Sequence, residues 1–241
     1  MPSMEEIYDS DAAGYDRLVR AEDSRGELAP VLHRIAGWLN ARVVEAGIGT
    51  GRLTRCYADA VRSVEGFDRS QHMLDRAREN LMPWADRIRL RRADHRKLPV
   101  ADAVADVFVE GWAFGHAVVD AARAAADDAG LADAVREVTQ ELLGEARRVV
   151  RPGGAVVIAE TLGTNVDLPA APLPELDEFY RLLERVHGFT RETIRTDYRF
   201  ATPDEAAEAC GFFFGPELGA AVRARGQEVV PEFTGVWWAQ R

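Results

Sequence analysis

The sequence predicts an α/β fold: a seven-stranded, mostly parallel, doubly wound sheet with helices on both faces. Short apolar segments typical of buried strands alternate with longer segments whose apolar residues recur at helical spacing. The first such strand, Val43–Val44, runs directly into a glycine turn, and several later strands end in an acidic residue. Strands that alternate with helices pair in parallel, so their carboxyl ends lie along one edge of the sheet. Ligands bind at that edge in folds of this class.

The composition indicates a soluble globular protein. Its 241 residues are 47% hydrophobic, which is enough for one large core, so we expect a single domain over residues 1–241. The net charge of −10 disfavours a nucleic-acid substrate, because phosphate backbones carry charge of the same sign. The chain has no apolar run of membrane-spanning length and no signal-peptide pattern, which predicts a cytoplasmic protein without a membrane partner.

The glycine turn predicts a binding site for a ligand with a negative or strongly polar group. Gly47, Gly49 and Gly51 stand at every second position, where they allow a tight turn and a close approach of the ligand to the main chain. A helix that begins near Gly51 directs unpaired N–H groups toward that ligand. A dinucleotide-binding turn, G-x-G-x-x-G, requires glycine at position 52, where this chain has Arg52.

The residues that are present, Glu45-x-Gly47-x-Gly49-x-Gly51, resemble motif I of the class I S-adenosylmethionine (SAM)-dependent methyltransferases. The run from Asp68 to Met73 resembles the family's D-x-S-x-x-M segment. The helix that ends at R-P-G-G, followed by the strand Ala155–Glu160, resembles the family's passage into its fifth strand. The resemblance therefore covers Glu45 to Glu160 at the level of motifs. It implies SAM as the cofactor and S-adenosylhomocysteine (SAH) as the product.

The resemblance also implies roles for residues at the strand ends. Glu45 and the turn glycines would hold the methionine moiety of SAM, Asp68 its ribose hydroxyls and Asp94 its adenine amine. Tyr15, on a leading helix, would close over SAM or the substrate, and the alternative is that it only holds this helix to the domain. Further cofactor contacts are expected from residues beside these strand ends, which are Arg69, Met73, His95 and Glu110. No metal-ligand spacing is present, so we predict no metal site.

The segment Glu110–His116, after the fourth predicted strand, is expected to face the methyl acceptor. It lacks the Pro-Pro-aromatic run of adenine and cytosine methyltransferases and the paired glutamates of arginine methyltransferases. Trp112 and Phe114 instead predict an apolar pocket for a small organic molecule. His116 is a candidate general base, because histidine changes charge near neutral pH, and the alternative is a hydrogen-bonded histidine at a helix start. Tyr180 and Tyr198 are further candidates for substrate contact.

The rest of the chain is expected to be arranged around this core. We expect N-terminal cap helices over residues 1–39, the SAM-binding core over 40–160, a lid-like insertion that covers the substrate over 161–192, and C-terminal strands and helices over 193–241. Within the last segment, Ile194–Phe200 predicts a single continuous strand, and Val229–Ala239 predicts the closing strand.

The predicted function is transfer of a methyl group from SAM, by in-line displacement, to a small-molecule acceptor such as a secondary metabolite. Two alternatives stay open at this point. One is a catalytically silent SAM-binding scaffold or sensor, and the other is a nicotinamide-dependent oxidoreductase, which Arg52 in the glycine turn disfavours. A monomer or a homodimer is expected.

Overall fold

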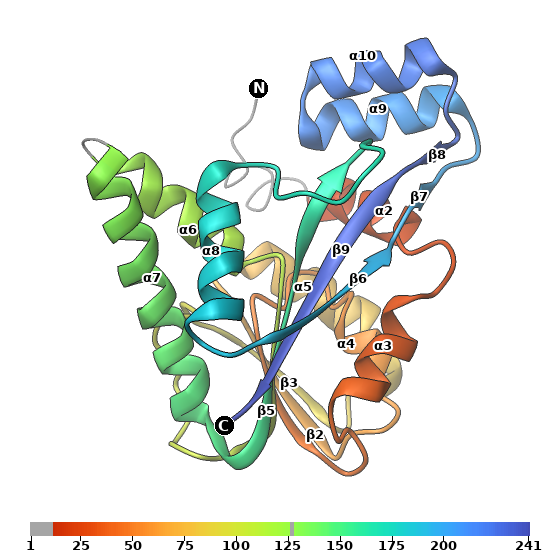
Figure 1. Ribbon diagram of the computed structural model, residues 1–241. Coiled ribbons are helices and arrows are strands. Elements are labelled where there is room, and N and C mark those ends of the chain that lie inside the picture. The colour runs from red at the N-terminus through yellow and green to blue at the C-terminus, as the bar shows by residue number, and fades with distance from the viewer. Residues whose placement is uncertain (1–11, 126–127) are drawn as a thin grey trace.

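The computed structural model describes residues 12–125 and 128–241, and one large sheet runs through the molecule (Figure 1). Its seven strands have the order β3-β2-β1-β4-β5-β9-β6. Five of them pair in parallel: β1 (Arg42–Ala46), β2 (Ser63–Asp68), β3 (Ile88–Arg92), β4 (Ala105–Gly111) and β5 (Val150–Thr164). β9 (Glu232–Gln240) lies antiparallel between β5 and β6 (Thr190–Arg195). The predicted seven-stranded, mostly parallel sheet is confirmed.

The strand order places the glycine turn at the centre of the carboxyl edge. From β1 the chain continues outward through β2 and β3, and β4 then returns to the other side of β1. The turn Gly47–Gly51 follows β1, and Trp112 follows β4. Doubly wound sheets bind their ligands where the strand order reverses in this way. The turn and Trp112 therefore both border the position at which a ligand is expected.

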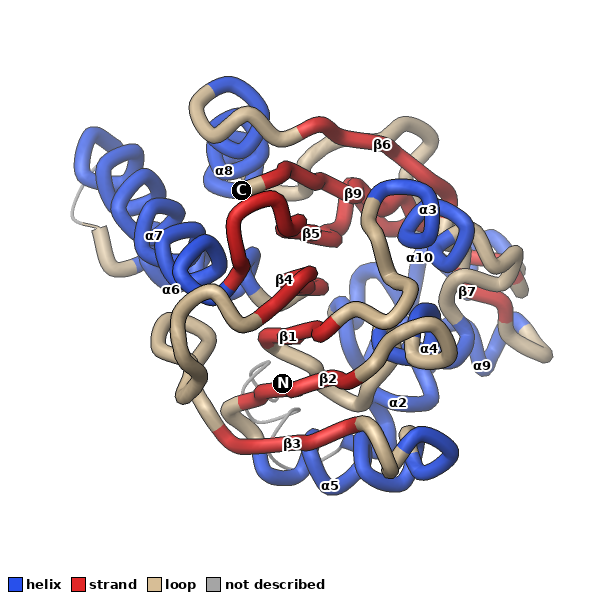
Figure 2. The backbone as a smooth tube through the Cα atoms, turned by 90° about the horizontal axis from the view of Figure 1, so that it is seen from below, coloured by secondary structure: helices blue, strands red, loops and turns tan. Residues whose placement is uncertain are grey.

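Helices cover both faces of the sheet, as Figure 2 shows from the end of the strands. α6 (Phe114–Arg123), α7 (Asp128–Val149) and α8 (Pro174–Arg185) pack together on one face. α3 (Leu28–Ile35), α4 (Thr54–Tyr57) and α5 (Gln71–Asn80) lie on the other, and α5 is followed by a 3₁₀ turn, Met82–Trp84. Val43 and Val44 are both buried, one in the core of each face. This explains the continuous apolar pattern of their strand.

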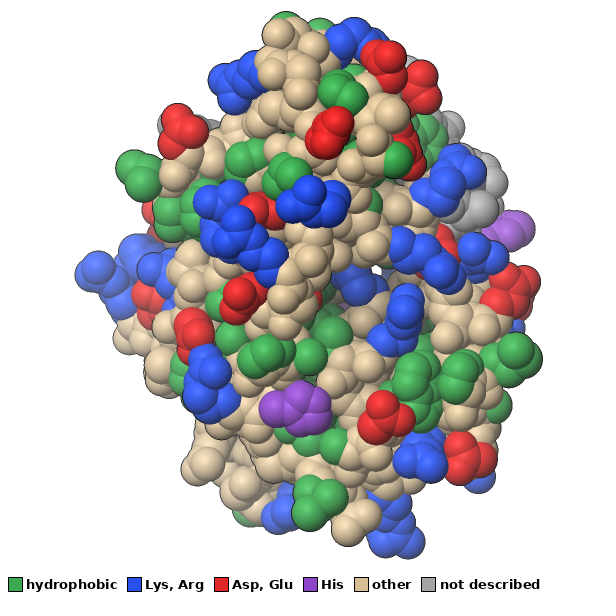
Figure 3. Space-filling view, turned by 90° about the vertical axis from the view of Figure 1, so that its right-hand side faces the viewer, with side chains coloured by type: hydrophobic (Ala, Val, Ile, Leu, Met, Phe, Trp, Pro, Cys, Tyr) green, Lys and Arg blue, Asp and Glu red, His purple; other side chains and the backbone are tan. Residues whose placement is uncertain are grey.

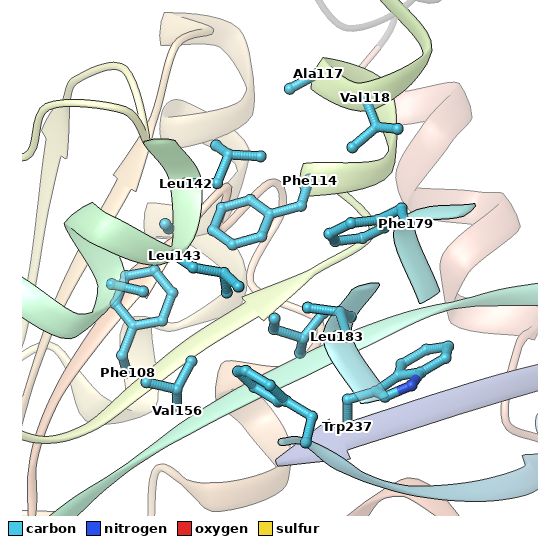
Figure 4. Packing of buried hydrophobic residues seen from close by; sticks show 14 of the residues in the cluster. Phe108, Phe114, Ala117, Val118, Leu142, Leu143, Val156, Phe179, Leu183 and Trp237 are labelled. Carbon is cyan, nitrogen blue, oxygen red and sulfur yellow. The ribbon is translucent and has the colours of Figure 1, made fainter. Parts of the chain in front are cut away.

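The larger core lies between the sheet and α6, α7 and α8 (Figure 4). Phe108 and Val156 of the sheet lie in it with Phe114, Leu142 and Leu183, which come from one helix each. All five side chains are buried, and burial of one such side chain contributes about 1.5–3 kcal/mol to stability. This packing fixes the beginning of α6, and the loop that leads to it, at the carboxyl edge of the sheet.

The predicted strand Ile194–Phe200 is wrong in one respect, because it divides into two short strands. β6 ends at Arg195, and β7 (Tyr198–Arg199) pairs instead with β8 (Val229–Val230) in a separate two-stranded sheet. Asp197, between them, is buried and accepts hydrogen bonds from Arg195 Nε and Nη2 (2.7 and 2.8 Å) and from the Glu232 N–H (3.1 Å). A buried carboxylate that needs these partners cannot continue the ladder of the large sheet.

The segments expected to cover the carboxyl edge differ from the prediction. Of residues 161–192, Thr161–Thr164 extend β5, and α8 lies in the helical layer with Phe179 and Leu183 fully buried, so only the loop 165–173 remains at the edge. A hairpin of α9 (Pro203–Phe214) and α10 (Pro216–Arg225) lies above the edge and packs on α2 (Ala12–Ala21) (Figure 1). Residues 1–11 of the predicted N-terminal cap lie outside the described residues.

Candidate functional site

The glycine turn has a backbone that only glycine adopts readily. Gly47, Gly49 and Gly51 have φ values of +64°, +54° and +86°. A Cβ atom at Gly47 would lie 2.3 Å from the Cβ of Ala113, and one at Gly51 would lie 2.7 Å from Leu81 Cδ1. At Gly49 the nearest atom would be Tyr15 Cε1, at 3.9 Å. The turn is therefore closely packed at its two ends and has room at its middle glycine.

Asp68 connects the end of β2 to the middle of this turn. Its Oδ2 accepts a hydrogen bond from the Gly49 N–H and its Oδ1 accepts one from the Ser70 N–H, both at 2.9 Å. Burial raises the pKa of Asp68, and the hydrogen bonds from Ser70 and Gly49 oppose that rise. A carboxylate offers about four acceptor positions. Asp68 thus holds the turn in place and can accept further hydrogen bonds from a ligand.

Tyr15 lies above Gly49 and joins α2 to the α9–α10 hairpin. Its ring is 5.6 Å from that of Phe213, at the end of α9. Burial raises the pKa of the Tyr15 hydroxyl, Arg52 opposes that rise and Asp68 adds to it. The hydroxyl is therefore within electrostatic range of both groups. The structure brings Tyr15, Gly49 and Asp68 together, as the sequence predicts.

Glu45 does not occupy the position that the family resemblance implies. Its side chain is buried beneath the turn, where Oε2 accepts hydrogen bonds from Thr54 Oγ1 (2.6 Å) and from the Tyr57 hydroxyl. Burial raises the pKa of Glu45 to about 7. The expectation that Glu45 holds the methionine moiety is therefore corrected: this carboxyl joins β1 to α4 and supports the turn from within. Alternation along β1 causes this, because Glu45 shares the face of Val43.

The residues after β3 lie beside the beginning of α6. Asp94 Oδ1 accepts a hydrogen bond from the Arg96 N–H (2.8 Å), and the His95 ring meets the Phe114 ring edge-on at 5.5 Å. Burial lowers the pKa of His95 to about 4, and the charges of Arg69 and His116 add to that effect. Arg69, Asp94, His95 and His116 thus form one group of predicted site residues. Met73 differs, because it is buried in the core.

Two glutamates hold the N-terminus of α6. Glu110 Oε1 accepts hydrogen bonds from the N–H groups of Ala113 (2.6 Å) and Phe114 (2.9 Å), and Glu160 Oε1 accepts one from Gly115 (2.6 Å). Burial raises the pKa of Glu110, and repulsion by Glu160 adds to the rise. Burial raises the pKa of Glu160 to about 8. Glu110, predicted as a cofactor contact, thus has a capping role that the sequence did not indicate.

The surroundings of His116 favour its neutral form. Burial lowers the pKa of its imidazole, the nearby Asp120 opposes this, and Arg69 adds to it. A neutral imidazole can accept a proton, as a general base must. Its position, however, is within electrostatic range of His95 and Arg69. His116 therefore belongs to the group beside Asp94.

Trp112 and Tyr198, two predicted substrate contacts, lie around Arg52. The Arg52 guanidinium lies 3.4 Å from the centre of the Trp112 ring and forms an ion pair with the buried Glu22 carboxylate. Burial raises the pKa of Tyr198, Glu232 adds to that rise and Arg52 opposes it, so these groups are also within electrostatic range. In the sequence, Arg52 is only the residue that excludes a dinucleotide-binding turn. No pattern in the sequence indicates its contacts with Trp112 and Glu22.

Tyr180 packs in the core on the face of the sheet that α8 covers, and its hydroxyl lies within electrostatic range of Glu232. Its ring stacks on Trp237 at 4.5 Å, and its hydroxyl donates a hydrogen bond to the Thr161 carbonyl oxygen (2.9 Å). It lines a cavity of about 510 Å³ with Arg191 and the proline-rich segment 169–174. Of the four predicted substrate residues, Tyr198 and Tyr180 are both within electrostatic range of Glu232, Trp112 lies on Arg52, and His116 lies with His95 and Arg69.

Within the part of the chain that the structure describes, no three His, Cys, Asp or Glu side chains are placed to bind a metal ion. The same residues include no helix that is long and apolar enough to span a membrane.

Comparison with known proteins gives consistent matches. Residues 44–158 match a family model described as a methyltransferase domain. An uncharacterized methyltransferase of Anoxybacillus flavithermus is 27% identical over 70% of this chain and 68% of its own length. The malonyl-[acyl-carrier protein] O-methyltransferase of Pectobacterium atrosepticum is 31% identical over 61% of this chain and 49% of its own. Residues 44–158 of the chain therefore form a methyltransferase domain.

The fold of this methyltransferase is also that of solved relatives. An N-methyltransferase of Haemonchus contortus, solved with phosphomonomethylethanolamine and SAH, aligns with a TM-score of 0.59 over 100% of this chain and 60% of its own, at 17% identity. The methyltransferase spans from about half to two thirds of the length of the curated relatives it matches. The relatives' names include both O- and N-methylation, so they do not identify the acceptor atom.

The packing of the turn predicts that alanine at Gly47 is more destabilising than alanine at a comparable open site. Gly188 has a similar φ of +73°, and no atom lies within 4 Å of the position that a Cβ would take there. Gly188→Ala should therefore cost only the left-handed backbone, about 1–2 kcal/mol. Gly47→Ala adds the contact with Ala113, and overpacking of this kind costs about 1–3 kcal/mol more. Urea unfolding of both variants measures the difference, and equal losses would contradict the described packing.

The buried Glu110–Glu160 pair predicts a stability that falls as pH rises. The folded-state pKa of Glu160, about 8, exceeds its ordinary value of 4.5, so its contribution is present below pH 4.5 and is lost as pH rises through 8. Glu160→Gln keeps an acceptor for the Gly115 N–H but cannot ionise. We expect this variant to have a smaller loss of unfolding free energy between about pH 5.5 and 8.5 than the wild type. The exposed Glu137→Gln is the control, and equal pH slopes in all three proteins would contradict the assignment.

Proposed function

We propose that this methyltransferase uses SAM and transfers its methyl group to a small-molecule acceptor by in-line displacement. The observation that carries the proposal is the middle of the glycine turn, where the Gly49 N–H is bonded to Asp68 at the end of β2 and a Cβ atom would meet Tyr15 only at 3.9 Å. A neighbouring carboxylate and bare main chain suit the ribose and methionine parts of SAM. The solved relative that contains SAH supports the same cofactor.

The residues present fit this cofactor in two further respects. The Thr50 hydroxyl, within the turn, is buried and has no hydrogen-bond partner among the described residues, which suits a polar ligand at the turn. Asp94 and His95 follow β3, and Asp68 lies at the end of the neighbouring strand β2. An adenine ring that lies beyond the ribose along this edge would therefore reach them. We assign the ribose to Asp68, the adenine to Asp94 with His95 and Arg69, and the methionine moiety to the main chain of the turn.

When bound, SAM supplies a methyl group activated by a positive sulfonium. The protein's own contribution is then mainly to align the acceptor atom with the methyl carbon, because alignment alone can supply a large share of the acceleration. Trp112 and Tyr198 border the turn on the side of β4 and β9, and we place the acceptor there. His116 lies with His95 and Arg69, so we propose that it lines the adenine side and is not the base that acts on the acceptor.

A small organic acceptor is also what the charge of the chain favours. The net charge is −10, although Figure 3 shows Lys and Arg side chains gathered in a band across one face, with acidic side chains among them. Mixed charge of this kind does not provide the continuous positive surface that a nucleic-acid backbone requires. We therefore propose a small molecule as the acceptor and no nucleic-acid partner.

The ribose assignment predicts that Asp68→Ala weakens SAH binding. A hydrogen bond to a charged group contributes about 1.5–3 kcal/mol, so the loss of the ribose contact should raise the Kd at least about tenfold. Isothermal titration calorimetry with SAH, SAM and NAD⁺ measures this directly. Glu65→Ala, an acid on the same strand that pairs with Arg91, is the control and should bind SAH normally. Unchanged affinity in Asp68→Ala, or binding of NAD⁺ in place of SAH, would contradict the proposal.

A silent scaffold and an enzyme differ in turnover. We expect formation of SAH when the protein is incubated with SAM and a broad panel of small metabolites. SAH binding without any turnover across such a panel would favour the scaffold.

A further inference from the structure

Four side chains from separate segments lie in contact with Arg52 or within its electrostatic range beside the glycine turn, and we name the five residues the Arg52 cluster: Glu22, Arg52, Trp112, Tyr198 and Glu232. Arg52 is in contact with Trp112 and Glu22, and it is within electrostatic range of Tyr198 and Glu232. Trp112 follows β4, and Glu232 begins β9, opposite Thr164 at the end of β5. The cluster therefore lies at the carboxyl edge of the sheet, beside the turn, where the proposed function places the acceptor.

Two carboxylate oxygens in the cluster are buried without a partner among the described residues. Glu232 Oε1 accepts a hydrogen bond from Thr161 Oγ1 (2.7 Å), and the Thr164 side chain also faces this carboxyl group. Its Oε2 has no partner within hydrogen-bond geometry, and the residue is only 2% exposed. Glu22 is 7% exposed; its Oε2 faces Arg52, and its Oε1 has no partner. A buried acceptor left without a hydrogen bond costs about 1–3 kcal/mol. Both oxygens lack a donor that a ligand could supply.

The charges of the cluster specify what kind of donor is missing. The Arg52 guanidinium forms an ion pair with Glu22, and Glu232, which is only within electrostatic range of Arg52, has no ion pair of its own among the described residues. The nearby Arg195 is already committed to Asp197 through two hydrogen bonds. The Trp112 ring shows that the site accepts a cation against an aromatic face, because Arg52 already lies on it at 3.4 Å. One more positive group could donate hydrogen bonds to the two free carboxylate oxygens and would balance the excess negative charge.

We propose that the methyl acceptor is an amine, whose nitrogen is held by the Glu232 carboxylate beside the rings of Trp112 and Tyr198. This inference rests on the proposed function and narrows it, because it names the class of acceptor. It excludes a neutral alcohol as the preferred acceptor, since a hydroxyl group supplies a hydrogen bond but no charge.

Methyl transfer to an amine at this site conserves atoms and charge. An ammonium group loses one N–H proton to the Glu232 carboxylate, and the freed nitrogen lone pair forms a bond to the methyl carbon. The carbon–sulfur bond breaks with its electron pair on sulfur, which changes from sulfonium to thioether. The positive charge thus moves from sulfur to nitrogen. Glu232, protonated in this step, is then neutral, and the carboxylate of Glu22 is the remaining negative group of the cluster that can stabilise the charge as it develops. Burial raises the pKa of Glu232 to about 7, so the carboxyl can both take up and release a proton near neutral pH.

Matched pairs of ligands test the inference. Benzylamine with benzyl alcohol, and 2-phenylethylamine with 2-phenylethanol, differ only in the amine or hydroxyl group. Each is titrated into the SAH-bound protein, and each is then assayed for methyl transfer from isotopically labelled SAM. We expect the amines to bind and to accept the label, and we expect the alcohols to bind at least about tenfold more weakly, as the loss of a charged hydrogen bond implies.

Glu232→Gln separates charge from shape. Glutamine keeps an acceptor for Thr161, so the variant should fold and should bind SAH as the wild type does, while its affinity for the amines falls about tenfold. Glu228→Gln, an exposed acid four residues away, is the matched control. Equal binding of amines and alcohols, no binding of either amine by SAH-bound protein, or unchanged amine affinity in Glu232→Gln would overturn the inference. Failure of the wild type to bind SAH would overturn the proposed function itself.

Discussion

The hydrogen bond from the Gly49 N–H to Asp68 is the contact on which the rest of the site depends. It can form only because three glycines take left-handed backbone conformations, and so let the chain turn back toward the end of β2. The two outer glycines are fixed by neighbours from other elements, Ala113 beside Gly47 and Leu81 beside Gly51. The turn is thus held at both ends and at its centre. A rigid turn presents its main chain to a ligand without a further cost of ordering.

Several carboxyl groups are buried around the turn, and burying each of them costs free energy. Glu45 supports the turn from β1, Glu110 and Glu160 hold the beginning of α6, and Glu22 and Glu232 surround Arg52. Burial raises the pKa of Glu45, Glu110, Glu160 and Glu232. At α6, hydrogen bonds from the main chain compensate in part, although Glu110 Oε2 has no partner among the described residues. Around Arg52, Glu22 and Glu232 each have an oxygen without a partner and accept no main-chain hydrogen bond that the structure records, and there the same cost points to a ligand.

Much of the fold, and the centre of the site, could be predicted from the sequence. The glycine turn, the acid at the end of β2 and the serine cap of α5 are local patterns, because their key contacts are set by nearby residues or by the regular order of the strands. Predictions failed for side chains whose contacts depend on residues that are not neighbours in the sequence. Nothing near Glu45 in the chain indicates that Tyr57 rather than a ligand would meet it.

The same limit applies to Arg52 and to α8. Arg52 acquires its role only from Glu22 and Trp112, which the fold brings from either side of the turn. The helix α8 was expected in a lid, but Phe179 and Leu183 pack in the core that α6 and α7 share with the sheet, and this packing draws the helix into the layer. Which apolar partner a helix finds is decided by the whole fold, so the pattern of its own residues predicts a buried face and not its position.

A crystal structure of the protein with SAH would be the most direct measurement of where the cofactor binds. We predict the ribose hydroxyls within hydrogen-bond distance of Asp68, the amino-acid end of SAH against the main chain of Gly49, and the adenine beside Asp94. A nucleoside bound elsewhere, for example in the cavity beside Tyr180, or one that leaves Asp68 without a contact, would contradict the proposed site.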